Sequence, residues 1–266
     1  MSAQTENNQQ SNIQLEVQGH TAIVTMNNPP ANTWTEQSLN DLKQTVLSLN
    51  ENRNIYALVI TGQGEKFFSA GADLNLFADG DKTVAFDMAR AFSDAFETLS
   101  SFRGVSIAAI NGYAMGGGLE VALACDIRIA EEQSTMALPE AKVGLLPCAG
   151  GTQNLTALVG EGWAKRIILC GEQVEPELGL QIRLVEEVVP KGQALLTAIR
   201  LADSVGNQSP SSVTACKSLI QNTRSATLNQ GLIKERELFV KLFDTQDQTE
   251  GVNAFLQKRT PDWKNK

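Results

Sequence analysis

The chain has 266 residues, of which 42% are hydrophobic, so it can bury the core of one large domain or of a core with a smaller subdomain. Its formal net charge of −8 argues against nucleic acid or an anionic membrane as the main partner. The single histidine, His20, excludes multi-histidine metal sites. Because His20 follows Gly19 at the tip of a predicted hairpin, we interpret it as a solvated turn residue rather than a catalytic one.

The cysteines, the first residues and the longest apolar stretch together predict where in the cell the protein is found. The cysteines have no C-x-x-C pair, which predicts reduced, mostly buried thiols in a cytoplasmic protein; they are Cys125, Cys148, Cys170 and Cys216. Residues 1–12 are rich in Gln, Asn and Ser and have no apolar core, so they predict a disordered tail and no signal peptide. The longest apolar stretch, 105–129, is interrupted by charged residues and predicts a buried strand and helix, not a membrane span.

The first half of the chain alternates apolar strands with helical spacing. Strands are predicted over 13–17, 21–26, 57–61, 105–110, 126–130 and 134–138. Helices are predicted over 35–50, 83–101 and 117–125. Because residues 57–61 are fully apolar, that strand should be covered on both faces. The segment 67–74 is rich in small residues and permits a close approach of the backbone to another group.

The second half is almost entirely helical. After the loop 142–151, helices are predicted over 152–159, 162–170, 193–205, 210–223, 228–243 and 249–257, with one further strand over 185–189. The pattern therefore predicts an α/β fold with three parts. These are a tail over 1–12, a core with the active site over 13–205 and a helical region over 206–266, with a soft boundary near Gly206.

A glycine run lies between the strand 105–110 and the helix that follows it. A helix N-terminus presents unpaired N–H groups, and Gly117 has no side chain to shield its own. Gly71 frees the backbone near Ala72, which could offer a second N–H to the same oxygen. Two such donors make an oxyanion hole, although either glycine site alone is more simply a tight turn. A dinucleotide-binding motif is excluded because Val121 stands where its third glycine belongs.

Two carboxylates accompany the glycine run. Glu120 heads an otherwise apolar helix, and Glu140 follows Pro139. Taken singly, Glu120 could be a helix-capping residue and Glu140 a solvated loop residue. If both face one apolar pocket, they titrate as a coupled pair, and one can activate water while the other donates a proton.

These motifs together resemble the crotonase, or enoyl-CoA hydratase/isomerase, superfamily over nearly the whole chain after the tail. The resemblance is carried by the segments 68–74, 108–120, 125–126, 139–140, 150–153 and 249–259. It implies a spiral of ββα units, a C-terminal all-helical trimerisation region, and a homotrimer or a dimer of trimers. It also implies an acyl-CoA thioester as the substrate, with coenzyme A as part of that substrate, no separate cofactor and no metal.

The resemblance also assigns roles to residues of this chain. Ala72 and Gly117 match the amides that hold the thioester oxygen, while Glu120 matches the residue that activates water and Glu140 the one that protonates the carbon next to the carbonyl. The implied reaction is syn hydration of a trans-2-enoyl-CoA to a 3-hydroxyacyl-CoA, a step of fatty-acid β-oxidation. The implied substrate-binding residues are Ala70, Gly71, Asp73, Leu74, Met115, Gly116, Leu145 and Lys258.

The chain departs from the common pattern of the superfamily at several positions, namely Pro30, Asn75, Arg103-Gly104, Cys148 and Asn154. Pro30 and Asn75 stand where basic residues often meet the coenzyme A phosphates, and Cys148 replaces a usual glycine beside the acyl pocket. The alternatives are a Δ3-Δ2 enoyl-CoA isomerase, another acyl-CoA-processing crotonase, and a non-catalytic or RNA-binding relative. The acidic charge argues against RNA binding.

Overall fold

The computed structural model describes residues 12–266, so the tail predicted over 1–12 lies outside the described residues except for Asn12. Its larger sheet has, in spatial order, the strands β1 (Ile13–Gln18), β2 (Thr21–Met26), β3 (Ala57–Gly62), β5 (Val105–Ile110), β7 (Ile127–Glu131) and β9 (Glu187–Val189). The β1–β2 pair is an antiparallel hairpin, and the remaining neighbours are parallel. A smaller parallel sheet contains β4 (Phe67–Ser69), β6 (Tyr113–Met115) and β8 (Met136–Ala137).

From β3 onward, successive strands of the chain alternate between the two sheets. β3, β5 and β7 each join the larger sheet, and the strand that follows each of them joins the smaller one. After each such pair the chain turns into a helix: α2 (Lys82–Ser100), α3 (Gly117–Ala124) and α4 (Gly151–Leu169). This repeated order is the predicted spiral of ββα units. It brings the ends of β4, β6 and β8, and the turns that follow them, to one side of the molecule.

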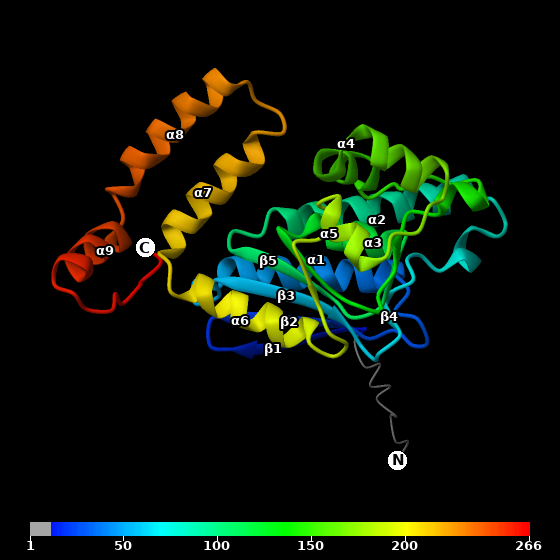
Figure 1. Cartoon of the computed structure of the whole chain (residues 1–266), viewed down its shortest axis with the longest axis horizontal. Helices are drawn as coiled ribbons and strands as arrows, with labels where there is room; N and C mark the ends of the chain where they lie inside the picture. Colours follow the sequence, from blue (N-terminus) through cyan, green and yellow to red (C-terminus); the bar gives the residue numbers. More distant parts are fainter. Residues whose placement is uncertain (1–11) are drawn as a thin grey trace, which may run out of the picture.

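Helices cover both faces of the larger sheet, as the apolar strand 57–61 predicted (Figure 1). Alternate residues of β3 point to opposite faces. Leu58 and Ile60 pack in the main core with α1 (Glu36–Glu51), α2 and α3, whereas Ala57 and Val59 pack against α6 (Ala194–Gly206). α1 begins at a capping box in which Thr35 and Ser38 exchange hydrogen bonds.

The helices after α6 form an arm that extends from the body (Figure 1). The arm consists of α7 (Pro210–Asn222), α8 (Leu228–Leu242) and α9 (Gln246–Leu256). No residue of α8 is buried, although this helix carries several large apolar side chains. α6 ends at Gly206 and α7 begins at Pro210. The boundary expected near Gly206 and the division into separate domains remain predictions.

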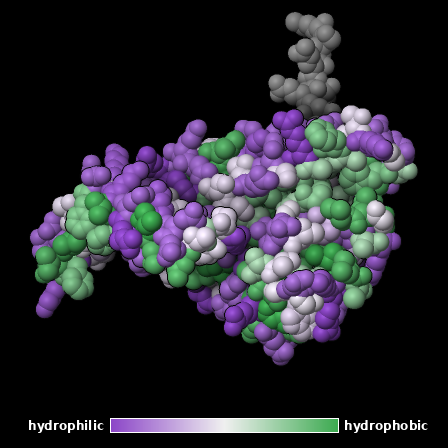
Figure 2. Space-filling view, turned by 90° about the horizontal axis from the view of Figure 1, so that it is seen from above, coloured by the Kyte–Doolittle hydropathy of each residue, from purple (hydrophilic) through white to green (hydrophobic). Residues whose placement is uncertain are grey.

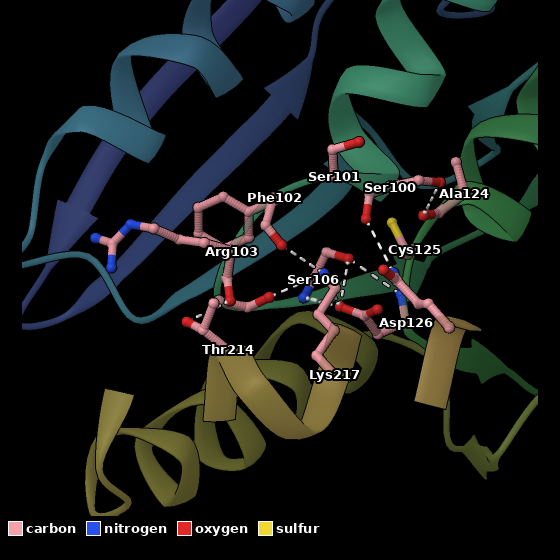
Figure 3. A network of polar contacts seen from close by, with 12 residues as sticks. Ser100, Ser101, Phe102, Arg103, Ser106, Ala124, Cys125, Asp126, Thr214 and Lys217 are labelled. Carbon is pink, nitrogen blue, oxygen red and sulfur yellow. Dashed lines mark hydrogen bonds and ion pairs between the residues drawn. The ribbon is translucent and has the colours of Figure 1, made fainter. Parts of the chain in front are cut away.

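A network of polar contacts joins α7 to the body (Figure 3). Lys217 Nζ donates to the carbonyl oxygens of Phe102 and Gly104 at 2.6 and 2.9 Å, and it pairs with Asp126 Oδ2 at 2.7 Å. The same Asp126 oxygen accepts from the N–H and hydroxyl of Ser106 on β5. The network therefore fixes the first helix of the arm against the chain segment that directly follows α3.

The last residues of the chain fold back onto the body and onto α9. Asn265 is 4% exposed and exchanges two hydrogen bonds with the backbone and side chain of Arg53, at 2.6 and 2.8 Å. Its N–H donates to the buried carboxylate of Asp247 in α9, and the Lys266 carbonyl accepts from the Gln246 N–H. The end of the chain is thus hydrogen-bonded to both the body and the arm.

Several predictions about elements need correction. The thiols are free as expected, but only Cys125 is buried, while Cys148, Cys170 and Cys216 are exposed, so the prediction of mostly buried thiols is wrong. Of the strand predicted over 134–138, only β8 forms. The flanking residues lead into and out of the smaller sheet, whose strands are only two or three residues long. The sequence pattern also missed α5 (Pro176–Gln181), and the helices predicted over 152–159 and 162–170 meet at a kink at Gly160 within α4.

Candidate active site

A cavity of about 730 Å³ opens where the ββα turns converge. Its walls come from the segment after β4, from η1 (Leu74–Phe77), from α2, from the start of α3 and from the segment around η2 (Glu140–Val143). Large apolar side chains make up much of the wall, including Leu74, Phe77, Leu145 and Leu146. Both predicted carboxylates, Glu120 and Glu140, line this same cavity.

The two glycine turns meet at the inner side of the cavity. Gly71 and Gly116 have φ values of +89° and +53°, which favour glycine. A Cβ at Gly71 would lie 2.7 Å from the Met115 carbonyl oxygen and 3.1 Å from the Gly117 nitrogen, so only glycine allows this contact. Ala72 and Gly117 both line the cavity, and within residues 12–266 no acceptor is assigned to either N–H. The two amides are therefore available to a ligand oxygen.

Glu120 is 2% exposed and lies in the first turn of α3, which is buried along its whole length. Its Oε1 accepts hydrogen bonds from the backbone N–H groups of Ala149 and Gly151, at 2.8 and 2.9 Å. Burial raises the pKa of the Glu120 carboxyl, and the bonds from Gly151 and Ala149 oppose that rise because they stabilise the charged form. The result is an anion-supporting site within an apolar environment.

Glu140 has a different environment. Its Oε2 is buried and has no hydrogen-bond partner among the described residues. Burial raises the pKa of the Glu140 carboxyl to about 7, and the charge of Glu120 adds to that rise. At neutral pH this carboxyl is therefore poised to hold or release a proton. Its Oε1 would lie 3.1 Å from a Cβ placed on Gly116, so the carboxyl sits directly beside the glycine turn.

Cys148 also lines the cavity, beside the two carboxylates. Cys148 is exposed as a whole residue, but partial burial of its thiol among the atoms of the cavity wall, together with the charges of Glu120 and Glu140, raises the pKa of Cys148 to about 11. A thiol with such a pKa stays protonated at neutral pH and is a poor nucleophile. The interpretation of Cys148 as a small wall residue therefore fits its surroundings better than a nucleophilic role.

Most of the other predicted site residues come together in the cavity: Ala70, Gly71, Leu74, Gly116 and Leu145 all line it. Asp73 and Met115 do not. Asp73 caps η1 through a hydrogen bond to the Asn75 N–H, and Met115 ends β6. Lys258 lies beyond α9 beside a separate surface hollow with Trp263, so one copy of the chain does not bring it to the cavity. Its assignment to substrate binding stays a prediction.

Sequence reasoning missed several residues of the wall. Ala85, Ala89 and Phe92 follow one face of α2, at intervals of four and three residues, and all line the cavity. Their spacing was visible as a helical face, but nothing in the sequence indicates that this face meets the cavity. Lys142 supplies a cation to the wall, and Gly151 supplies the N–H that holds Glu120.

No group of three or more His, Cys, Asp or Glu side chains in residues 12–266 could hold a metal ion. Within the same residues, every helix is too short or too polar to cross a membrane.

Comparison with known proteins gives concordant matches. The family model described as enoyl-CoA hydratase/isomerase matches residues 16–266. A 2,3-dehydroadipyl-CoA hydratase from Escherichia coli is 38% identical over 92% of this chain and 95% of its own length. A solved structure of DspI from Pseudomonas aeruginosa is 62% identical with a TM-score of 0.94, covering 98% of this chain and 99% of that chain. An enoyl-CoA hydratase structure from Bacillus anthracis is 34% identical with a TM-score of 0.92, covering 96% and 100%.

Proposed function

The chain belongs to the enoyl-CoA hydratase/isomerase family and is an enoyl-CoA hydratase, and from that premise we propose that it adds water syn across a trans-2-enoyl-CoA by two-glutamate acid/base catalysis. The product is a 3-hydroxyacyl-CoA. The observation that carries this mechanism is the shared cavity: both carboxylates and both unengaged amides, those of Ala72 and Gly117, line one space.

The amides of Ala72 and Gly117 receive the thioester carbonyl oxygen. As water adds to the double bond, negative charge builds up on this oxygen, and donors already in place stabilise it without reorganisation. The Gly117 N–H also lies at the positive end of the α3 dipole. Each such donor lowers the barrier by ~3 kcal/mol in measured cases of this kind.

The two glutamates divide the proton transfers. Glu120, which is supported as an anion by two amides, takes a proton from the attacking water. Glu140, whose pKa is about 7, gives its proton to the carbon next to the thioester carbonyl. After one turnover the Glu140 proton is in the new C–H bond of the product and Glu120 holds a proton taken from water, and exchange with solvent restores the starting state. The pair keeps one proton throughout the catalytic step.

Substitution of Glu120 tests the proposal against isomerisation. The Glu120→Gln variant keeps the shape of the side chain but loses the base for water, so hydration of crotonyl-CoA, followed by the loss of its absorbance, should fall by about a thousandfold. A Δ3-Δ2 isomerase using Glu140 alone would keep its activity on a 3-enoyl-CoA in this variant. Full hydration activity in Glu120→Gln contradicts the two-glutamate mechanism.

The exposed apolar residues of the arm support a further part of the proposal, assembly into homotrimers or dimers of trimers. The large apolar side chains of α8 and α9 lie mostly in solvent in the single chain; they are Leu228, Leu232, Ile233, Phe239, Val240, Val252, Phe255 and Leu256. Figure 2 shows hydrophobic groups, in green, among the polar residues on the surface of the arm. An isolated helix of this length gains most of its stability from packing, so these side chains need a partner surface.

A further inference from the structure

The backbone from Ala149 to Gly151 holds one oxygen of Glu120 and leaves the other free. Both N–H groups donate to Oε1, at 2.8 and 2.9 Å, while no donor is assigned to Oε2 among the described residues. The two donors come from the loop before α4 and from the first residue of that helix. Oε1 must stay within hydrogen-bond distance of both N–H groups, so the carboxylate is held in one rotational position.

Gly151 is packed against the group that it holds. A Cβ at this position would lie 2.7 Å from Glu120 Oε1, 3.0 Å from Glu120 Cγ and 2.9 Å from Pro147 Cβ. Its φ lies outside the positive range, so the backbone conformation itself would accept another residue. The requirement for glycine at position 151 therefore comes from the Glu120 side chain and from Pro147, not from backbone geometry.

We propose that Gly151 is a positioning residue for the hydration step, which fixes Glu120 with Oε1 bound to the backbone and Oε2 directed to the attacking water. This inference rests on the proposed function of Glu120. A methyl group at position 151 would displace the carboxylate and weaken its two amide bonds. The displaced Glu120 would then be badly placed to take a proton from water, and its pKa would rise because bonds that stabilise the anion are lost, so less of it would be ionised at a given pH.

The first experiment compares Gly151→Ala with Gly162→Ala in the full-length protein, using crotonyl-CoA as substrate. A Cβ at Gly162, on the same helix, would meet nothing within 4 Å, so this control should keep kcat within about twofold. Gly151→Ala should lower kcat by about thirtyfold or more while KM changes little. The acidic limb of its profile of kcat/KM against pH should move to higher pH, a shift that a general loss of packing does not produce.

Shortening Glu120 provides a rescue test. The Glu120→Asp side chain lacks one methylene and withdraws from the position of the added methyl group. The activity lost through Glu120→Asp should therefore be smaller in the Gly151→Ala background than in the wild-type background. Equal losses in both backgrounds, or a folded Gly151→Ala protein with unchanged kcat and pH profile, would overturn the proposal.

A measurement on the wild-type protein keeps the proposal testable if Gly151→Ala does not fold. The amide resonances of Ala149 and Gly151 should titrate together with pH in the NMR spectrum and should lose this titration in Glu120→Gln. Independent titration of the two amides, or titration that persists in Glu120→Gln, contradicts the shared bond to Glu120. Wild-type protein that does not hydrate crotonyl-CoA would sink the proposed function, whereas the amide titration would still report on the contact.

Discussion

Glu120 and Glu140 have the same side chain and opposite surroundings. Glu120 is almost fully buried but receives two backbone N–H groups, whereas Glu140 Oε2 is buried without a partner. An unpaired buried oxygen favours the neutral carboxyl, and paired amides favour the carboxylate. The resting proton of the pair is thus expected on Glu140, which gives the two residues distinct roles in hydration.

Removal of the Glu140 carboxyl should be severe for catalysis. Glu140→Ala deletes the group that protonates the substrate carbon, and turnover of crotonyl-CoA should fall by about a thousandfold or more, a barrier increase of ~4 kcal/mol. Glu140 is only half-buried, and its Oε2 makes no hydrogen bond that the substitution would remove. The thermal midpoint of unfolding should therefore change little. Turnover within tenfold of wild type would exclude Glu140 as the proton donor.

The pH profile should report the shared proton. With the Glu140 pKa near 7, the active singly protonated pair loses its proton above that pH, so kcat/KM should fall about tenfold per pH unit there. At low pH a second proton neutralises the base, and kcat/KM should fall again. A kcat/KM that stays constant above about pH 7 would contradict this model.

Residue identities at the centre of the site could be predicted because short motifs carry them. Glu120, Glu140, Ala72 and Gly117 were expected at one site, and all four line the same cavity, although their roles remain proposals. The bonds from the loop before α4 to Glu120 could not be predicted, because they join residues about thirty positions apart through backbone groups that every residue possesses. The exposure of Cys148 likewise depends on the tertiary path of its loop.

At the scale of elements, one helical face of α2 forms part of the cavity wall. Phe92 lies against Gly117, with its ring 2.9 Å from where a Cβ would sit, and Ala89 and Ala85 follow towards the helix start. At a rise of 1.5 Å per residue, this face extends ~10 Å from Phe92. We expect the acyl chain to lie along it, where two small residues leave room.

A bulky residue in this face should shorten the acceptable acyl chain. Ala89→Trp fills the middle of the face, so kcat/KM for a ten-carbon enoyl-CoA should fall at least about a hundredfold more than kcat/KM for crotonyl-CoA. Steady-state assays over a series of chain lengths measure this ratio. Parallel losses for short and long substrates would place the acyl chain elsewhere in the cavity.

The polar network of α7 makes a prediction about stability. The Lys217 side chain is 10% exposed and its partner Asp126 is 21% exposed. Lys217→Met therefore leaves a poorly solvated carboxylate with only its bonds from Ser106, and it removes the Lys217 donor from two carbonyl oxygens (Figure 3). The free energy of unfolding, measured with denaturant, should fall by about 2–3 kcal/mol. Lys234→Met, which removes an exposed pair with Glu237, should change it by less than about 0.5 kcal/mol. Equal losses of unfolding free energy in Lys217→Met and Lys234→Met would show that the network adds little to stability.

Long periodic elements were predictable, and short ones were not. The strand 57–61 and the helices of the arm have clear apolar spacing and were found near their predicted positions. β4, β6 and β8 have two or three residues each, too few for a period to appear, and the smaller sheet was therefore missed as a sheet. Its existence depends on parallel pairing between segments far apart in the sequence.

At the scale of the whole molecule, the arm leaves several large apolar side chains uncovered in a single copy. Phe239 and Phe243 form an edge-to-face pair in and just after α8 and are 63% and 58% exposed. If they pack against further copies of the chain, the double variant Phe239→Asp/Phe243→Asp should sediment as a monomer, whereas the wild type sediments as a trimer or a hexamer. Leu47→Asp, a similar change at an exposed residue of α1, is the control and should leave the mass unchanged. A wild-type monomer would contradict the assembly.

The folded-back C-terminus has a practical consequence for how the protein is prepared. Lys266 is itself exposed, but its backbone oxygen accepts from the Gln246 N–H, and Asn265 just before it is enclosed between Arg53 and Asp247. A purification tag or fluorescent fusion attached after Lys266 therefore begins directly beside the junction between the body and the arm. Fusions joined at the opposite terminus avoid this junction and are the sounder choice for the assays above.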